Sequence, residues 1–275
     1  MDFDCRENAN GTFEVFNTKI GDIYFSNVGA YKEALEKFVL PSLPVLQNKN
    51  KIKILDVCYG MGYNSKTFVD YILKNKINIK YDIDGIEIDK NILAFGLLIF
   101  DKNIGEEINL EFGREILNQL NLEENIKKIS GENWIKSFLP KFCPKFNEFC
   151  PKNMVYLYQN NFLSTFLHNI YYQNQSNFKN ISNFRLFNVD LHDFLQENDS
   201  TYDLIFHDAF SILKQPDMWS EDVMQSYYDI INKNGRFLTY SNSRVLRRTL
   251  EKVGFEVEIN FDDNSKQNGT IGIKS

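Results

Sequence analysis

The residues best suited to chemistry are a pair of glycines and several carboxylates that follow apolar runs of the chain. Gly60 and Gly62 lie in the turn Cys58-Tyr59-Gly60-Met61-Gly62-Tyr63-Asn64, directly after the apolar run 52–57. Glycines at this position let a nucleotide approach the backbone at the start of the following helix. Glu87 ends the next apolar run, where a carboxylate can accept hydrogen bonds from ribose hydroxyls. These residues predict an adenosine-type ligand, and the alternative for Glu87 is a solvated loop acid.

Asp56 narrows the identity of that ligand. A dinucleotide site usually has the pattern G-x-G-x-x-G, but the third glycine is absent here. A carboxylate beside the turn would repel a pyrophosphate, whereas it suits the cationic methionyl end of S-adenosylmethionine. S-adenosyl-L-methionine is therefore the predicted cofactor. Its predicted contacts are Asp56, Tyr59, Gly60, Gly62, Asn64, Glu87, Asp190 and Asp208.

Asp190 and Asp208 follow later apolar runs. Asp190 follows the run 184–188 and can accept a hydrogen bond from an adenine amino group, cap a short helix from residue 191, or do both. Asp208 follows the run 202–207, at the edge of the sheet where ligands bind, and we predict it at the reaction centre. Pro216 and Trp219 can form a rigid pocket wall beside it. The alternatives are a turn-forming Asp208 and a core Trp219.

The elements that must position these residues alternate between strands and helices, the pattern of a parallel sheet covered on both faces. We predict strands at 52–57, 81–87, 184–188, 202–207, 235–240, 255–260 and 269–274. We predict helices at 30–40, 64–75, 90–100, 217–232 and 243–253 from apolar spacings of three and four residues. The turn between the last two strands is too short for a crossover helix, so the final strand should run antiparallel. The predicted fold class is α/β, a Rossmann-like class I methyltransferase with a seven-stranded, mostly parallel sheet, an antiparallel last strand and a helical insertion.

The domain organisation follows from the same alternation. The length of 275 residues fits a single methyltransferase domain over 1–275. Residues 101–183 interrupt the alternation, and we predict an insertion with a helix at about 106–127 and short helices that cap the substrate side. The alternative is a poorly ordered excursion. Residues 1–45 are predicted to be an N-terminal extension on the substrate side.

Composition limits the classes of function. The net charge of −6 argues against a nonspecific, phosphate-driven grip on nucleic acid, but it leaves room for a local basic patch. The chain has no long apolar run and no N-terminal signal pattern, so we expect a cytoplasmic protein without membrane association. The spacing of its cysteines and histidines matches no metal-binding pattern, so we expect no metal site.

Four segments carry motifs of one known family. Residues 22–26, followed by Gly29 and Glu33, read D-x-Y-F-S with a later glycine and acid. Residues 58–64 read like G-F-G-x-G-L-N, and 208–219 like D-G-F-x-P-x-x-x-P-x-M-W. Residues 246–255 read like V-R-R-x-L-x-x-x-G-F. Together they resemble the methyltransferase domain of the tRNA-modifying protein MnmC and its stand-alone relatives.

This resemblance implies methylation of 5-aminomethyl-uridine, often 2-thiolated, at the wobble position of tRNA. The partners would be the tRNA anticodon stem-loop and the enzymes that supply the aminomethyl precursor. Asp208 would orient the amine and accept its proton. Tyr24, Phe210 and Trp219 would flank the extruded base. Arg247 and Arg248, with Arg244, would reach anticodon phosphates, unless they form only a solvated helix face.

The chain also departs from the family pattern. Cys58 replaces the first glycine of the turn, and Ile212 or Leu213 stands where a proline is usual. We expect no flavin-dependent oxidoreductase domain, which the larger family members carry. A basic patch on the insertion, with Lys127, Lys128, Lys136, Lys141 and Lys145, could bind RNA despite the acidic balance. Two alternatives stay open: an aminopropyltransferase resembling spermidine synthase, and a noncatalytic scaffold with the same fold.

Overall fold

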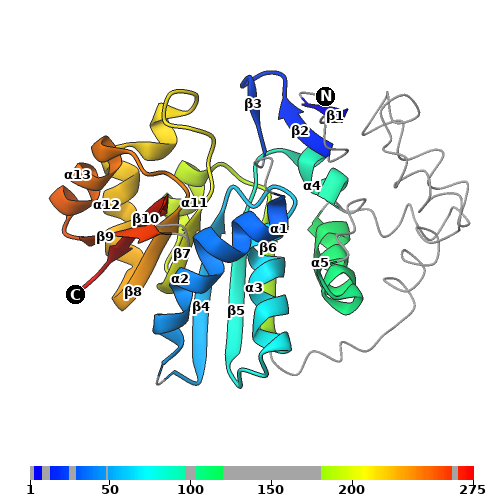
Figure 1. The fold of residues 1–275 in the computed structure, drawn as a ribbon, viewed down its shortest axis with the longest axis horizontal. Coiled ribbons are helices and arrows are strands. Elements are labelled where there is room, and N and C mark those ends of the chain that lie inside the picture. Colours follow the sequence, from blue (N-terminus) through cyan, green and yellow to red (C-terminus); the bar gives the residue numbers. More distant parts are fainter. Residues whose placement is uncertain are drawn as a thin grey trace, which may run out of the picture.

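A seven-stranded sheet in the order β6-β5-β4-β7-β8-β10-β9 forms the centre of the protein (Figure 1). This computed structural model describes residues 3–7, 13–24, 29–47, 49–96, 103–119, 181–261 and 266–275. Strands β4 (Lys51–Val57), β5 (Lys80–Ile86), β6 (Ile181–Phe187), β7 (Tyr202–His207) and β8 (Ile231–Thr239) pair in parallel. Strand β10 (Gln267–Ile273) runs antiparallel to both β8 and β9 (Glu256–Phe261). The predicted fold class and its antiparallel last strand are therefore confirmed.

Helices cover both faces of this sheet (Figure 1). One face packs against α1 (Ala30–Ala34), η1 (Leu35–Val39), α2 (Leu40–Ser42), η2 (Leu43–Leu46), α3 (Tyr63–Lys74) and α5 (Glu106–Gln119). The other face packs against α11 (Leu191–Glu197), α12 (Glu221–Ile230) and α13 (Arg244–Val253). Helix α4 (Lys90–Gly96) follows β5. Each layer is joined to the sheet by an apolar core, which holds the carboxyl ends of the strands in fixed places.

Two predicted helices differ from the structure. The predicted helix 30–40 continues to Leu46, with a wide π turn at 35–39 and a tight turn at 43–46 around Pro41 and Pro44, which lack a backbone N–H. The predicted helix 217–232 was wrong as one element, because it is divided into η3 (Pro216–Trp219) and α12. Ser220 separates them with extended backbone, and its hydroxyl accepts a hydrogen bond from the Val223 N–H at 3.4 Å. Strand β8 then begins at Ile231, earlier than predicted.

A small second sheet lies at the N-terminus, where no strands were predicted. Strands β1 (Phe3–Glu7), β2 (Phe13–Asn17) and β3 (Asp22–Ile23) pair antiparallel. The Asn17 side chain accepts hydrogen bonds from the backbone N–H groups of Lys19 (3.1 Å) and Ile20 (2.9 Å), which closes the turn between β2 and β3. This turn brings the following Tyr24 over the carboxyl edge of the large sheet.

The predicted insertion is described only in part. Its first helix is α5, which confirms the start of the helix predicted at about 106–127. Residues 120–180, including the five lysines proposed as a basic patch, lie outside the described residues. Within the described parts of the chain, no helix is both long and apolar enough to cross a membrane.

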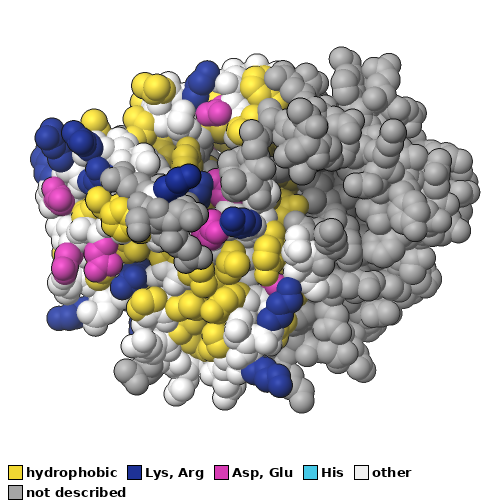
Figure 2. Space-filling model, viewed as in Figure 1, with side chains coloured by type: hydrophobic (Ala, Val, Ile, Leu, Met, Phe, Trp, Pro, Cys, Tyr) yellow, Lys and Arg dark blue, Asp and Glu magenta, His cyan; other side chains and the backbone are white. Residues whose placement is uncertain are grey.

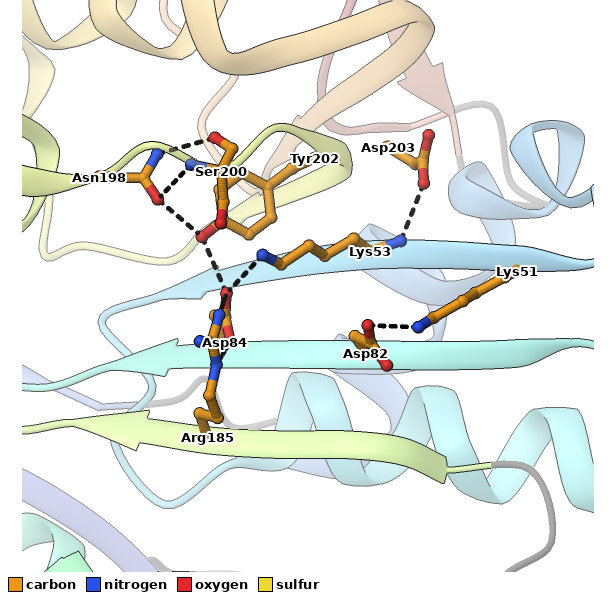
Figure 3. Close-up of polar contacts among 9 residues, drawn as sticks. All are labelled: Lys51, Lys53, Asp82, Asp84, Arg185, Asn198, Ser200, Tyr202 and Asp203. Carbon is orange, nitrogen blue, oxygen red and sulfur yellow. Dashed lines mark hydrogen bonds and ion pairs between the residues drawn. The ribbon is translucent and has the colours of Figure 1, made fainter.

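A buried carboxylate ties four strands of the large sheet together (Figure 3). Asp84 on β5 is 1% exposed and accepts two hydrogen bonds of 2.8 Å from the Arg185 guanidinium on β6. The Tyr202 hydroxyl on β7 donates to the same carboxylate at 2.9 Å, and Lys53 Nζ on β4 lies 3.3 Å away. Two residues earlier, Asp82 pairs with Lys51 at 2.7 Å, but half of the Lys51 side chain is exposed.

The two aspartates should therefore differ in their contribution to stability. Replacing Asp84 with Ala leaves the Tyr202 hydroxyl and two cations without their shared acceptor, and we expect a loss of about 2–3 kcal/mol. Asp82→Ala is the matched control on the same strand, and we expect a loss of less than about 1 kcal/mol, because exposed ion pairs contribute little. Urea unfolding of both variants measures the difference, and equal losses would contradict this account of the network.

Candidate functional site

A cavity of about 520 Å³ opens at the carboxyl edge of the large sheet. Its floor is formed where β4, β5 and β7 end, and the segment that follows β2 covers it from the other side. The residues singled out from the sequence that line it are Tyr24, Tyr59, Gly60, Asn64, Glu87, Asp190, Asp208 and Phe210. The fold has thus gathered residues from distant parts of the chain into one hollow.

The turn after β4 has an unusual backbone. Cys58, Gly60 and Gly62 have φ angles of 60°, 55° and 79°, in the left-handed region that favours glycine. A Cβ atom on Gly62 would lie 2.2 Å from the Tyr59 hydroxyl oxygen, so no other residue fits there. Cys58 adopts the same backbone region although it is not glycine. A residue other than glycine in this region carries backbone strain, which the surrounding packing must hold in place.

Glu87 holds the turn from the neighbouring strand. The Gly60 N–H donates to Glu87 Oε2 and the Asp89 N–H donates to Oε1, both at 2.9 Å. The side chain is 8% exposed, and burial raises its pKa to about 7. Each carboxylate oxygen retains acceptor capacity for a further donor on the cavity side. Ile88, which follows, also lines the cavity and is 65% exposed, so an apolar surface stands beside the acid.

Asp56, beneath the turn, and Gly62, within it, are not among the residues that line the cavity. Asp56 is fully buried, and its Oδ2 accepts hydrogen bonds from the Ser65 N–H (3.2 Å) and hydroxyl (2.5 Å). Its Oδ1 has no hydrogen-bond partner among the residues that the structure describes, and burial raises the pKa of Asp56 to about 7. Asp56 thus joins the end of β4 to the start of α3. This placement does not favour a direct contact between the cofactor and either Asp56 or Gly62.

Tyr59 and Asp190 each have a structural task as well as a place at the cavity. The Tyr59 side chain is 3% exposed and packs beneath the turn against Phe184, with ring centroids 5.9 Å apart. The Asp190 carboxylate accepts a hydrogen bond from the His192 N–H at 2.8 Å and so caps α11. Asp190 also lines the cavity, so the predicted capping is confirmed and a second contact with a ligand stays compatible with it.

Asp208 stands where the turn meets the opposite wall of the cavity. Its N–H donates to the Val57 carbonyl at 3.2 Å, and its Oδ2 accepts from the Asn64 side-chain amide at 2.9 Å. Burial is the main cause that raises the pKa of Asp208 to about 7, and the charge of Glu33 acts in the same direction. The Asn64 hydrogen bond and the charge of Lys37 act to lower this pKa. Asn64 was predicted to contact the cofactor, but in this structure it also orients the carboxylate of Asp208, the predicted catalytic residue.

Three residues of the cavity wall had no predicted role. Glu33 and Lys37 form an ion pair between a helix and its π turn, and Lys37 Nζ lies 5.5 Å from the centre of the Tyr240 ring. The Tyr240 hydroxyl donates to the Ala209 carbonyl at 3.0 Å, directly after Asp208. The spacing of four between Glu33 and Lys37 was a visible signal of a helical ion pair. Nothing in the local sequence indicated that this pair faces Asp208.

Aromatic rings form the outer wall. Tyr24 and Phe210 meet edge to face with ring centroids 5.0 Å apart, and both line the cavity. Trp219 was predicted as part of this wall, but it is 6% exposed and packs on His207 in the core. Its indole N–H donates to the Phe210 carbonyl at 2.8 Å. The assignment of Trp219 as a stacking residue is therefore corrected, because the indole supports Phe210 from behind.

Arg247 and Arg248 lie on α13 and do not line the cavity. Arg247 Nη1 donates to the Asn242 carbonyl at 2.7 Å, which fastens the segment before the helix. Arg248 is exposed on the helix surface. Within the described residues, no group of three or more His, Cys, Asp or Glu side chains could hold a metal ion.

Comparison with known proteins agrees with this geometry. Residues 149–275, just under half of the chain, match a family described as S-adenosyl-L-methionine-dependent methyltransferase. An uncharacterized protein of Methanocaldococcus jannaschii, MJ0670, is 25% identical over 269 residues, which are 98% of this chain and 59% of that protein. The bifunctional protein MnmC of Actinobacillus pleuropneumoniae, named for tRNA 5-methylaminomethyl-2-thiouridine biosynthesis, is 36% identical over 56 residues. That match covers 20% of this chain and 8% of the relative.

A solved structure shares the fold. The crystal structure of MnmC2 from Aquifex aeolicus superposes with a TM-score of 0.61 at 20% sequence identity, over 98% of this chain and 70% of that one. The chain spans about three fifths of the Methanocaldococcus protein and a small part of the Actinobacillus one. Residues 149–275 thus match a methyltransferase family and the chain shares the fold of MnmC2, and these matches do not favour the aminopropyltransferase alternative.

The backbone of the turn allows a test of the cofactor site. Gly62→Ala places a Cβ against the buried Tyr59 hydroxyl, so we expect a loss of about 2 kcal/mol or more in stability and at least tenfold weaker cofactor binding. Cys58→Gly keeps the left-handed backbone, so its stability and cofactor affinity should stay near those of the wild type. Thermal unfolding and calorimetric titration with S-adenosylhomocysteine measure both effects. Wild-type affinity in Gly62→Ala would show that the turn does not hold the cofactor.

Proposed function

We propose that this protein transfers a methyl group from S-adenosylmethionine to the amine of 5-aminomethyl-uridine, with or without 2-thiolation, at the wobble position of tRNA. The observation that carries the proposal is the position of Asp208. Its carboxylate is hydrogen-bonded to the glycine turn through Asn64 and stands in the same cavity as Glu87 and the Tyr24–Phe210 wall. Asp208 therefore stands where the residues proposed to bind the cofactor meet the residues proposed to bind the acceptor base.

The residues on the cofactor side fit S-adenosylmethionine. Gly60 offers open backbone, since a Cβ there would meet no atom closer than 3.7 Å, and Glu87 offers acceptors for the ribose hydroxyls. Ile88 and Leu191 provide apolar surface for an adenine ring, with Asp190 as the acceptor for its amino group. S-adenosylmethionine supplies a methyl group bound to a cationic sulfur. Buried carboxylates with raised pKa values are stabilised in their charged form by such a cation.

Asp208 is proposed to prepare the acceptor amine. An alkyl ammonium has a pKa of roughly 10 and must lose a proton before its nitrogen can attack. The Asp208 carboxylate hydrogen-bonds the ammonium and takes that proton, which its raised pKa favours. The nitrogen then forms a bond to the methyl carbon while the carbon–sulfur bond breaks and its electrons stay on sulfur. The remaining contribution of the protein is alignment of the three atoms.

The aromatic wall is proposed to hold the base. Tyr24 and Phe210 present ring surface to the cavity, and the Trp219 indole fixes the Phe210 backbone. A nucleobase that leaves the RNA stack gains contact with such rings in exchange for its lost neighbours. The partners under this proposal are the anticodon stem-loop and the enzymes that make the aminomethyl precursor, and the place of action is the cytoplasm.

Transfer of label tests the function directly. The protein is incubated with methyl-labelled cofactor and tRNA that carries 5-aminomethyl-uridine, and the nucleosides are then separated. We expect label in 5-methylaminomethyl-uridine, and at least a hundredfold slower transfer by Asp208→Asn with unchanged cofactor affinity, because general-base and positioning effects have about this size. Label in another nucleoside, or full activity of Asp208→Asn, would overturn the proposal.

The pH dependence tests the role of Asp208 separately. Its carboxylate is the active form, so single-turnover transfer should rise as pH increases through about 7. Lys37→Met removes a charge that lowers the Asp208 pKa and should move this rise upward by roughly half to one pH unit, whereas Glu33→Gln should move it downward. Lys32→Met on the same helix is the control, because Lys32 pairs with Glu36 and should not move the profile. Identical pH profiles for all three variants would show that Asp208 is not the group whose titration sets the rate.

A further inference from the structure

A second hollow, here called the side groove, opens directly beside the cavity. It has a volume of about 580 Å³ and is lined by Ser211, Ile212 and Leu213 on one side and by Ser241, Asn242, Ser243 and Val245 on the other. Lys37, Ser211 and Tyr240 line both hollows. The side groove is therefore the continuation of the cavity past the Lys37–Tyr240 contact, and a polymer bound in the cavity can extend into it.

Two exposed apolar side chains stand on the walls of the side groove. Leu213 is 92% exposed and Val245 is 68% exposed. They come from the loop after β7 and from the start of α13, so two segments distant in the sequence each contribute one exposed apolar side chain to the lining. Large apolar side chains with this exposure, beside a hollow and next to a functional site, are typical of a contact surface. Neither residue contributes to the buried cores.

Several cationic side chains lie on α13, the helix that carries Val245. Helix α13 reads RVLRRTLEKV, with four cations and one acid. Figure 2 shows Lys and Arg side chains gathered at the left edge of the molecule, over this helix. Arg244 precedes Val245, and Arg248 follows it by three residues on the same side of the helix. Arg247 instead donates to the Asn242 carbonyl and so shapes the end of the groove. The surroundings favour an anionic chain with flat apolar groups.

We propose that the side groove binds the nucleotide adjacent to the methylated one in the RNA strand. Its base would lie between Leu213 and Val245, and its phosphate would face Arg244 and Arg248. This inference rests on the proposed function, because it places the neighbour of a base held in the cavity. A single-stranded loop suits this arrangement, since its bases can leave the stack one by one and contact apolar side chains. The groove would make the enzyme prefer an RNA loop over a free nucleoside.

A double variant tests the groove without touching the cavity. Leu213→Ser with Val245→Ser removes two exposed side chains, so folding should be unchanged. We expect the KM for an anticodon stem-loop to rise roughly tenfold, from the loss of base contact, while kcat and the rate with free 5-aminomethyl-uridine stay the same. Phe261→Ser, at an exposed position on β9 that is 55% accessible, is the control for loss of apolar surface and should leave KM unchanged.

Cross-linking provides the second measurement. Stem-loops with 4-thiouridine on the 5′ or the 3′ side of the target nucleotide are irradiated with the wild-type protein and S-adenosylhomocysteine. We expect a cross-link from one of them to a peptide that contains residues 211–213 or 241–245. An active wild type whose KM is unchanged in the double variant, or cross-links that avoid both segments, would overturn the groove assignment alone. Absence of transfer to any RNA would instead overturn the proposed function and this inference with it.

Discussion

The backbone of the turn after β4 is the constraint on which the functional end of the protein depends. Three of its residues, Cys58, Gly60 and Gly62, have left-handed φ angles, and it rests on the buried ring of Tyr59. Two carboxylates hold it, Asp56 from below through Ser65 and Glu87 from the side through Gly60. Because buried side chains hold the turn from two sides, it has little freedom to relax, and α3 begins at a fixed point and angle.

Asp208 depends on that fixed point. Asn64 lies in the first turn of α3 and donates to the Asp208 carboxylate, so the position of the helix sets the orientation of the acid. The same carboxylate lies near the Glu33–Lys37 pair, whose charges act on its pKa in opposite directions. Burial raises the pKa values of Asp56, Glu87 and Asp208 to about 7. A cation in the cavity would recover part of the free energy that burying these acids costs.

Binding of RNA by an acidic protein is explained by the distribution of charge rather than by its sum. The net charge of −6 describes the whole chain, whereas Arg244 and Arg248 on α13 stand on the helix that contributes Val245 to the side groove. Salt screens electrostatic interactions over a distance of about 10 Å at ordinary concentrations. Cations close to a bound RNA strand therefore attract it more strongly than distant acidic residues repel it. The predicted lysine patch on the insertion would add to this cluster, but it lies outside the described residues.

The sequence by itself determined the strands of the large sheet, most helices, and the residues that stand at the ends of those strands, but not the small N-terminal sheet. Gly60, Glu87, Asp190 and Asp208 were predictable because parallel strands end at one edge of a sheet, so a residue that follows a strand lies near the ligand whatever the details of packing. Tertiary structure decided the rest, because those positions depend on contacts between distant segments. It placed Asp56 under the turn and Trp219 in the core, where their side chains support Ser65 and Phe210. It also brought Lys37 to Tyr240, and Leu213 and Val245 to the lining of one groove, pairs that no local pattern could join.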